Sequence, residues 1–139
     1  MIEVGRTGLS NTALGGDLES AFERILQGRA EALFLQGNLV TNRYQLEIGE
    51  FTTAHRLPTI GTRRENVVAG ALMSYGPNIA EMNRRAATYV DRILKGTSPA
   101  DLPIEQPMTF DFVVNLKTAR ELGITFPNEI MLQVTEVIQ

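Results

Sequence analysis

Apolar positions recur along the chain at two spacings, and these predict helices that alternate with strands. A first helix is predicted by apolar residues three and four positions apart, namely Leu18, Ala21, Phe22, Ile25 and Leu26. Asp17 is placed to cap this helix, and Gly28 to end it in a left-handed turn. Residues 2–4 suit a short strand, and residues 5–16 have the composition of a loop.

A compact apolar run at residues 32–35 shows no alternation, which indicates a strand covered on both faces. A second helix is predicted from about Asn42, with an apolar stripe formed by Tyr44, Ile48 and Phe51. It ends before Pro58, because the residue before a proline avoids helical backbone angles. Residues 59–61 then suit a short strand.

The longest helix is predicted to begin at Gly76-Pro77, after a polar run at residues 62–66 and an apolar stretch at residues 67–73. Its stripe consists of Ile79, Met82, Ala86, Tyr89, Val90 and Ile93. Gly96 is placed to end it.

Three prolines make residues 97–107 an extended connector rather than a helix. Residues 109–116 alternate between Phe110, Phe112, Val114 and Leu116 on one face and more polar positions on the other, so a strand is expected. A short helix at 117–122 ended by Gly123, a capped turn at 126–130 and a final strand at 133–138 complete the chain.

This alternation predicts one α/β domain over residues 1–139, with three layers: a mainly parallel sheet between helices on both faces. Within it we distinguish a core lobe at 17–98, the connector at 97–107, and a crossing strand with the C-terminal tail at 108–139. Ligands of such sheets sit beyond the carboxyl ends of the strands. The expected site is therefore formed by the loops at residues 36–41 and 62–66.

Composition removes several classes of function. Thirteen Lys and Arg against sixteen Asp and Glu give a net charge of −3, which argues against binding to a nucleic-acid backbone. No cysteine is present, and the single histidine, His55, leaves metal sites and catalytic triads short of ligands. We therefore expect no metal, no cofactor and no catalytic residue. No stretch is apolar for the roughly 20 residues that cross a bilayer.

The candidate ligand-binding residues are Gln36, Asn38, Thr41, Thr62 and Arg63. The amide of Asn38 offers both a donor and an acceptor to a zwitterion, although a loop asparagine is more often a turn former. An arginine after the next strand can clamp a carboxylate with two hydrogen bonds. For Arg64 and Glu65 we expect a solvated charge pair.

Four segments in one order carry a resemblance to a known family: residues 69–77 (AGALMSYGP), 89–96 (YVDRILKG), 99–107 (PADLPIEQP) and 115–123 (NLKTARELG). From about Leu18 to Ile138 the chain resembles the C-terminal lobe of a bacterial ABC transporter substrate-binding protein with the type I periplasmic binding protein fold.

The resemblance implies a non-enzymatic receptor that holds a small polar solute, such as an amino acid, and delivers it to a membrane permease. It also implies a periplasmic location, whereas the absence of a signal peptide from the sequence as written predicts the cytoplasm. Family members are roughly twice this length and have an N-terminal lobe before this one.

Two alternatives of other classes stay open. An isolated lobe exposes apolar surface, which predicts a self-associating module, a homodimer paired through residues 109–116 and the tail. A small α/β enzyme is the second alternative, because the fold alone does not fix a function. It would need a convergent set of titratable side chains.

Overall fold

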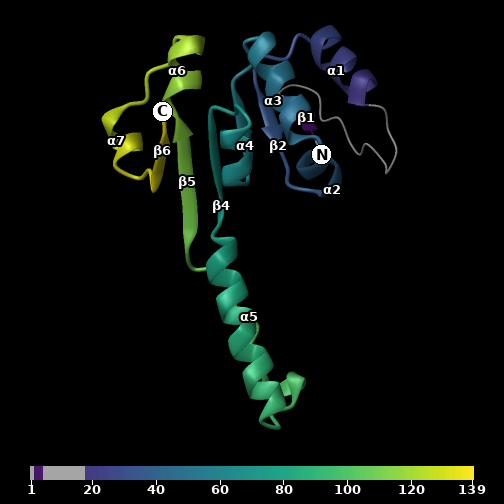
Figure 1. The fold of residues 1–139 in the computed structure, drawn as a ribbon, viewed down its shortest axis with the longest axis vertical. Coiled ribbons are helices and arrows are strands. Elements are labelled where there is room, and N and C mark those ends of the chain that lie inside the picture. Colours follow the sequence, from purple (N-terminus) through teal and green to yellow (C-terminus); the bar gives the residue numbers. More distant parts are fainter. Residues whose placement is uncertain (1, 5–17) are drawn as a thin grey trace.

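Six strands form one sheet in the computed structural model, which describes residues 2–4 and 18–139 (Figure 1). The strands lie in chain order: β1 (Ile2–Val4), β2 (Leu33–Leu35), β3 (Thr59–Gly61), β4 (Met73–Pro77), β5 (Phe110–Asn115) and β6 (Glu136–Ile138). β2, β3 and β4 are parallel, as are β5 and β6, whereas β1 and β5 run antiparallel to β2 and β4. The prediction of an α/β fold with a mainly parallel sheet is confirmed.

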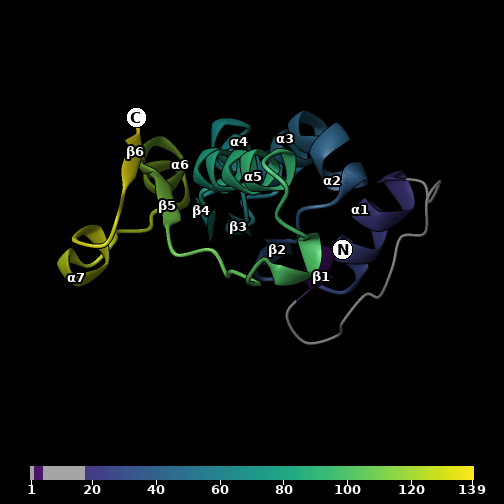
Figure 2. The same ribbon diagram turned by 90° about the horizontal axis from the view of Figure 1, so that it is seen from below.

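Helices connect these strands and carry most of the remaining described residues. They are α1 (Leu18–Gln27), α2 (Leu39–Arg43), α3 (Gln45–Ala54), α4 (Arg64–Val68), α5 (Ile79–Leu94), the 3-10 turn η1 (Pro99–Asp101), α6 (Leu116–Leu122) and α7 (Asn128–Met131). α3 and α4 lie on one side of β2, β3 and β4 (Figure 2).

The hydrophobic core lies under this helical side. Ile25 of α1, Ile48 of α3, and Leu33 and Leu35 of β2 form one buried cluster. The rings of Phe22 and Phe51 stack beside it with centroids 3.9 Å apart. Because side chains alternate across a strand, Leu33 and Leu35 share this face and Phe34 points to the other.

The second face of the sheet is more open. Phe34 is 38% exposed, Tyr75 of β4 55% and Phe110 of β5 40%. Tyr75 and Phe110 stack with centroids 5.4 Å apart, so these two rings shield one another rather than sitting under a helix. The strand at residues 32–35 was expected to be covered on both faces. That expectation is wrong at Phe34, which is partly exposed. An apolar sequence shows that a strand can be buried, but it does not show that a helix covers each face.

Several predicted boundaries shift for local reasons. The left-handed residue after α1 is Arg29, with φ of 49°, rather than Gly28. The helix expected from Asn42 is two helices, α2 and α3, because Asn38 caps an earlier turn. The polar run at 62–66 contains the start of α4.

The start of the long helix was also misplaced. Gly76-Pro77 ends β4 instead of opening α5, and Asn78 caps the helix by accepting a hydrogen bond from Glu81 N at 2.7 Å. Proline has no backbone N–H, and the end of a strand tolerates this because no hydrogen bond from that group is needed there. Gly123 ends α6 as predicted, and its backbone is left-handed with φ of 74°.

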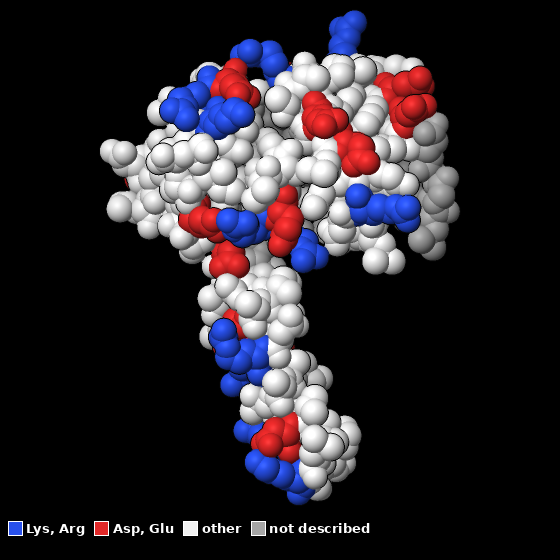
Figure 3. Space-filling model, viewed as in Figure 1, with Lys and Arg blue, Asp and Glu red and all other residues white. Residues whose placement is uncertain are grey.

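α5 and the connector project from the sheet as a stalk, defined here as residues 79–108 (Figures 1 and 3). None of the 16 residues of α5 is buried. Lys and Arg side chains lie beside Asp and Glu side chains on the stalk's visible face (Figure 3). Among the described residues no helix has the length and apolarity needed to cross a bilayer.

We predict that Ile48→Ala lowers the free energy of unfolding by about 2–4 kcal/mol, because truncation leaves a cavity in the core cluster. Leu46→Ala on the same helix is the matched control, since Leu46 is 64% exposed and should change stability far less. Urea denaturation followed by circular dichroism measures both. Equal destabilisation by the two variants would contradict the assignment of the core.

Candidate functional site

Two loops and the end of a third strand meet at the carboxyl edge of the parallel strands. The loop after β2 contains Gly37, the loop after β3 contains Thr62, and β4 ends with Gly76 and Pro77. A Cβ on Gly37 would lie 2.8 Å from Thr62 Oγ1, and a Cβ on Gly76 would collide with the Thr62 carbonyl oxygen. At Gly76 only glycine permits the approach, because the opposing atom belongs to the backbone; at Gly37 a Cβ would require the Thr62 side chain to move. The two loops predicted from the sequence are thus in direct contact.

Asn38 holds the first loop through a helix cap. Its Oδ1 accepts hydrogen bonds from Val40 N and Thr41 N, both at 2.9 Å. In return, Asn38 N donates to Thr41 Oγ1 at 3.0 Å, which completes a capping box. The side-chain oxygen of Asn38 therefore faces α2, and its Nδ2 has no hydrogen-bond partner among the described residues.

Thr41 ties the same cap to the end of β2. It is only 3% exposed, and its hydroxyl donates to the Gln36 carbonyl oxygen at 2.9 Å. The hydroxyl thus both donates and accepts within the loop. Gln36 itself is exposed, so its side chain faces solvent at the carboxyl edge.

Thr62 and Arg63 occupy the second loop at the start of α4. Arg63 N donates to Asn66 Oδ1 at 3.2 Å, and Asn66 is buried at 4% exposure. The Arg63 guanidinium lies 3.3 Å from Glu65 Oε2, with 39% of the side chain exposed. A cation at the mouth of this loop, held by one exposed carboxylate, can exchange that partner for an anionic ligand.

Arg64 has a different partner from the one that the sequence suggested. Its Nε and Nη2 donate to the two carboxylate oxygens of Glu136 on β6, at 2.8 and 2.7 Å. This bond holds the pKa of Glu136 below its usual value, mainly through the hydrogen bond from the guanidinium. The solvated pair expected between Arg64 and Glu65 is therefore wrong in its cation: Glu65 pairs with Arg63, whereas Arg64 ties α4 to the last strand.

Sequence reasoning missed a further polar pair at this edge. Asn78 Nδ2 donates to Asp111 Oδ1 at 2.9 Å, across the ends of β4 and β5. An asparagine before an apolar stripe is a recognisable helix cap, but its partner depends on the antiparallel register that places Pro77 opposite Phe110.

The described residues contain no cluster of His, Asp and Glu suited to a metal ion. His55 is exposed at the end of α3, where its Nδ1 lies 2.9 Å from the Phe51 carbonyl oxygen. It is the C-cap residue of α3, away from the loops after β2 and β3. The described carboxyl edge therefore offers amide, hydroxyl, guanidinium and carboxylate groups, which suit recognition of a polar solute.

Comparison with models of protein families assigns the chain to one family. A model of the family "ABC transporter substrate binding protein" matches residues 12–138. The chain belongs to this family. Its members bind solutes and are not enzymes, which confirms the class predicted from the four segments. A comparison with well-characterised protein sequences finds no match.

Solved structures agree on the fold. A conserved domain protein from Vibrio cholerae is similar with a TM-score of 0.78 and 24% identity, over 87% of this chain and 40% of that one. A domain from Streptococcus pneumoniae in complex with L-Trp gives 0.73 and 23%, over 86% of this chain and 41% of that one. A ligand-free, open substrate-binding protein from Clostridium difficile gives 0.64 and 19%, over 94% and 43%.

At these identities the likeness establishes the fold alone. The chain spans 40–43% of the length of these three structures. Contacts that the rest of such a protein makes to a solute are therefore not represented in the described site.

We predict that Asn38→Ala lowers the free energy of unfolding by about 1 kcal/mol, because two backbone N–H groups at the start of α2 lose their acceptor. Asn38→Asp retains the acceptor and should lose much less. Thermal denaturation of the three proteins separates these outcomes. Equal loss in both variants would show that the cap is not what Asn38 contributes.

The Arg64–Glu136 bond predicts a pH dependence. A carboxyl whose pKa is lowered in the folded state stabilises the fold above its unfolded pKa, about 4.3, and this contribution is lost as the pH falls through the folded pKa. Because both side chains are partly exposed, the effect is small. Glu136→Gln should lower the urea midpoint slightly at pH 7 and flatten its fall between pH 5 and about 3. An unchanged pH profile would contradict this.

Proposed function

We propose that this chain is the C-terminal lobe of a solute-binding component of an ABC uptake transporter. The observation that carries the proposal is the contact between the loops after β2 and β3 at the carboxyl edge of the sheet. Membership of the family supports it, because a solute-binding lobe needs such an edge. We further propose the division expected from the sequence: a core lobe at residues 17–98, from which α5 projects as part of the stalk, the connector at 97–107, and the crossing strand with the C-terminal tail at 108–139.

Within this edge, Gln36, Thr62 and Arg63 are proposed to contact the solute. Their side chains are exposed or half-buried on the two contacting loops. Asn38 and Thr41 are proposed to line the same site while holding its shape, because their oxygens are already used in the capping box. Their contribution to affinity then comes from a preorganised loop.

The proposed solute is a small zwitterion such as an amino acid. Arg63 supplies a guanidinium for a carboxylate, and its exposed pairing with Glu65 is weak enough to be exchanged. Glu65 in turn lies close enough to receive an ammonium group. The similar Streptococcus pneumoniae domain was solved in complex with L-Trp, which supports an amino acid as the first class to test.

Delivery to a membrane permease, and action outside the cytoplasm, complete the proposal. Both rest on the family to which the chain belongs.

A second candidate is self-association, as expected from an isolated lobe. Its support is the number of large apolar side chains exposed on the second sheet face and on the stalk. The route through residues 109–116 is restricted, because β5 already pairs with β4 on one edge and β6 on the other. Of the two expected segments, only the tail strand β6 lies at an edge of the described sheet, whose other edge strand is β1.

The test is a titration of the isotope-labelled protein with L-tryptophan and L-glutamate, followed by nuclear magnetic resonance. We expect weak binding, with Kd of about 1 mM or weaker, because many contacts of a full receptor are missing. Amide shifts should concentrate at residues 36–41 and 62–66. Arg63→Gln should abolish them, whereas Arg120→Gln, on α6 after β5 at the opposite sheet edge, should not.

Tight binding by a proven monomer would contradict the proposal, and so would shifts that survive Arg63→Gln. Shifts confined to the stalk would assign the ligand to another surface.

A further inference from the structure

Asparagine side chains hold the starts of α2, α4, α5 and α6 in the part of the chain that the structure describes. In each case Oδ1 accepts a hydrogen bond from a backbone N–H near the start of the helix. The four residues are Asn38, Asn66, Asn78 and Asn115. Their Oδ1 atoms are thus used in the same way, whereas each Nδ2 keeps two N–H donors whose partners differ.

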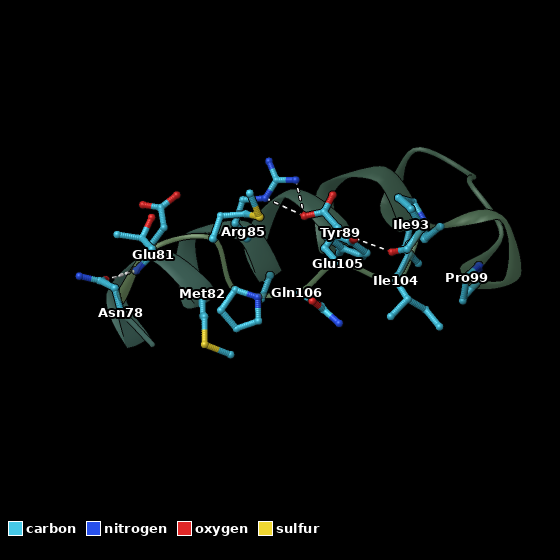
Figure 4. Close-up of a pocket in the computed structure, with 16 residues that line it drawn as sticks. Asn78, Glu81, Met82, Arg85, Tyr89, Ile93, Pro99, Ile104, Glu105 and Gln106 are labelled. Atoms are coloured by element: carbon cyan, nitrogen blue, oxygen red, sulfur yellow. Dashed lines mark hydrogen bonds and ion pairs between the residues drawn. The ribbon is translucent and has the colours of Figure 1, made fainter. Parts of the chain in front are cut away.

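Two of these amides donate to partners inside the protein. Asn115 Nδ2 donates to the Val67 carbonyl oxygen at 3.2 Å, and Asn78 Nδ2 donates to Asp111 Oδ1 at 2.9 Å. Asn78 lines a groove of about 1120 Å³ between α5 and the connector, where its Oδ1 accepts from Glu81 N (Figure 4). Both ends of these two side chains are therefore used by the fold itself.

Asn66 leaves its side-chain nitrogen unpaired, although the residue is only 4% exposed. Its other polar groups are all used. The backbone N donates to the Arg63 carbonyl oxygen at 3.1 Å, the carbonyl oxygen accepts from Ala71 N at 2.9 Å, and Oδ1 accepts from Arg63 N at 3.2 Å. Nδ2 has no hydrogen-bond partner among the described residues. An almost buried donor in this state calls for a water molecule or a ligand as its acceptor.

This free amide lies at the carboxyl end of β3. A Cβ on Gly61, the last residue of the strand, would come within 2.5 Å of Asn66 Oδ1 and 2.7 Å of its Cγ, so the amide packs against the strand end. Within the described residues, every fully buried side-chain nitrogen or oxygen has a hydrogen-bond partner. The unpaired Nδ2 is therefore the polar atom through which Asn66 reaches solvent, beside the backbone of Arg63.

Asn38 repeats this arrangement on the neighbouring loop. Its Oδ1 accepts from two backbone N–H groups of α2, while its Nδ2 has no partner within the described residues. The loops that carry Asn38 and Asn66 are the two that approach one another at Gly37 and Thr62. The two capping asparagines with a free amide are thus the two that lie on the loops after β2 and β3.

We propose that Asn66 is a ligand-binding residue, whose Nδ2 donates to the carboxylate of the solute together with Nδ2 of Asn38. The inference rests on the proposed function and identifies the group of the solute that is recognised. A carboxylate has two oxygens with about four lone pairs, enough for both amides and for the guanidinium of Arg63. An ammonium group brings only donors and can pair with neither amide.

The caps make these two amides selective. Because each Oδ1 is held by backbone N–H groups, each Nδ2 is already oriented and little order has to be created on binding. A solute without a carboxylate would cover both amides without supplying an acceptor, which disfavours its binding. We therefore expect the site to select solutes that carry a carboxylate.

The side-chain amide signals of the unmodified protein test this directly by nuclear magnetic resonance. Titration with L-tryptophan should shift the NH₂ signals of Asn38 and Asn66. The NH₂ signals of Asn78 and Asn115, whose nitrogens have internal partners, are the matched controls and should stay in place. Tryptamine, which is tryptophan without its carboxylate, should leave all four signals unshifted.

Asn66→Asp separates the two functions of this side chain. Aspartate keeps an acceptor for Arg63 N and nearly the same shape, but an oxygen replaces the two N–H donors. The affinity for L-tryptophan should fall at least about tenfold, whereas the affinity for tryptamine should not fall. Asn83→Asp, at an exposed position of α5, adds the same charge on the stalk and should change neither affinity.

Failure of this inference can be told apart from failure of the proposed function. Backbone shifts at residues 36–41 and 62–66 without a shift of the Asn66 NH₂ signal would overturn the inference alone, and would indicate that water satisfies this amide. An equal loss of affinity for both ligands in Asn66→Asp would also overturn it, because a purely structural role predicts that result. If neither L-tryptophan nor L-glutamate shifts any of these signals, the proposed function and the inference both fall.

Discussion

The close approach of Thr62 to Gly37 and Gly76 is the constraint on which the rest of the carboxyl edge depends. Two loops and the end of β4 approach one another this closely because Gly37 and Gly76 lack a Cβ. Arg63 directly follows Thr62 and is the N-cap residue of α4. The capping box of Asn38 and Thr41 fixes the neighbouring loop. The shape of the candidate site is therefore set by the close approach at two glycines together with the side-chain cap of the first loop.

Element type could be predicted from the sequence wherever one period was sustained. The apolar stripe of α5 and the alternation of β5 were enough to predict a helix and a strand without information from the rest of the chain. Boundaries failed where local capping competed with periodicity: Asn38 starts α2 before the stripe of Tyr44 begins, and Asn78 starts α5 after Pro77. Both residues are asparagines whose side chains accept from nearby backbone N–H groups.

The location of the site followed from the rule for parallel sheets, but the partners of its charges did not. Arg64 could be matched with adjacent Glu65 on the sequence, whereas the structure pairs it with Glu136, 72 positions away. The same holds for Asn78 and Asp111. Such pairs depend on strand order, and strand order depends on packing that one sequence does not reveal.

The two ends of the stalk leave and re-enter the sheet side by side. Pro77 lies opposite Phe110, and Asn78 N donates to the Thr109 carbonyl oxygen at 2.9 Å. β4 and β5 therefore form an antiparallel hairpin, and the stalk is the long connection between its two strands. Replacing the stalk by a tight turn would leave the hydrogen bonds between β4 and β5 intact. The stalk can therefore be lengthened, shortened or exchanged without changing the sheet from which it projects.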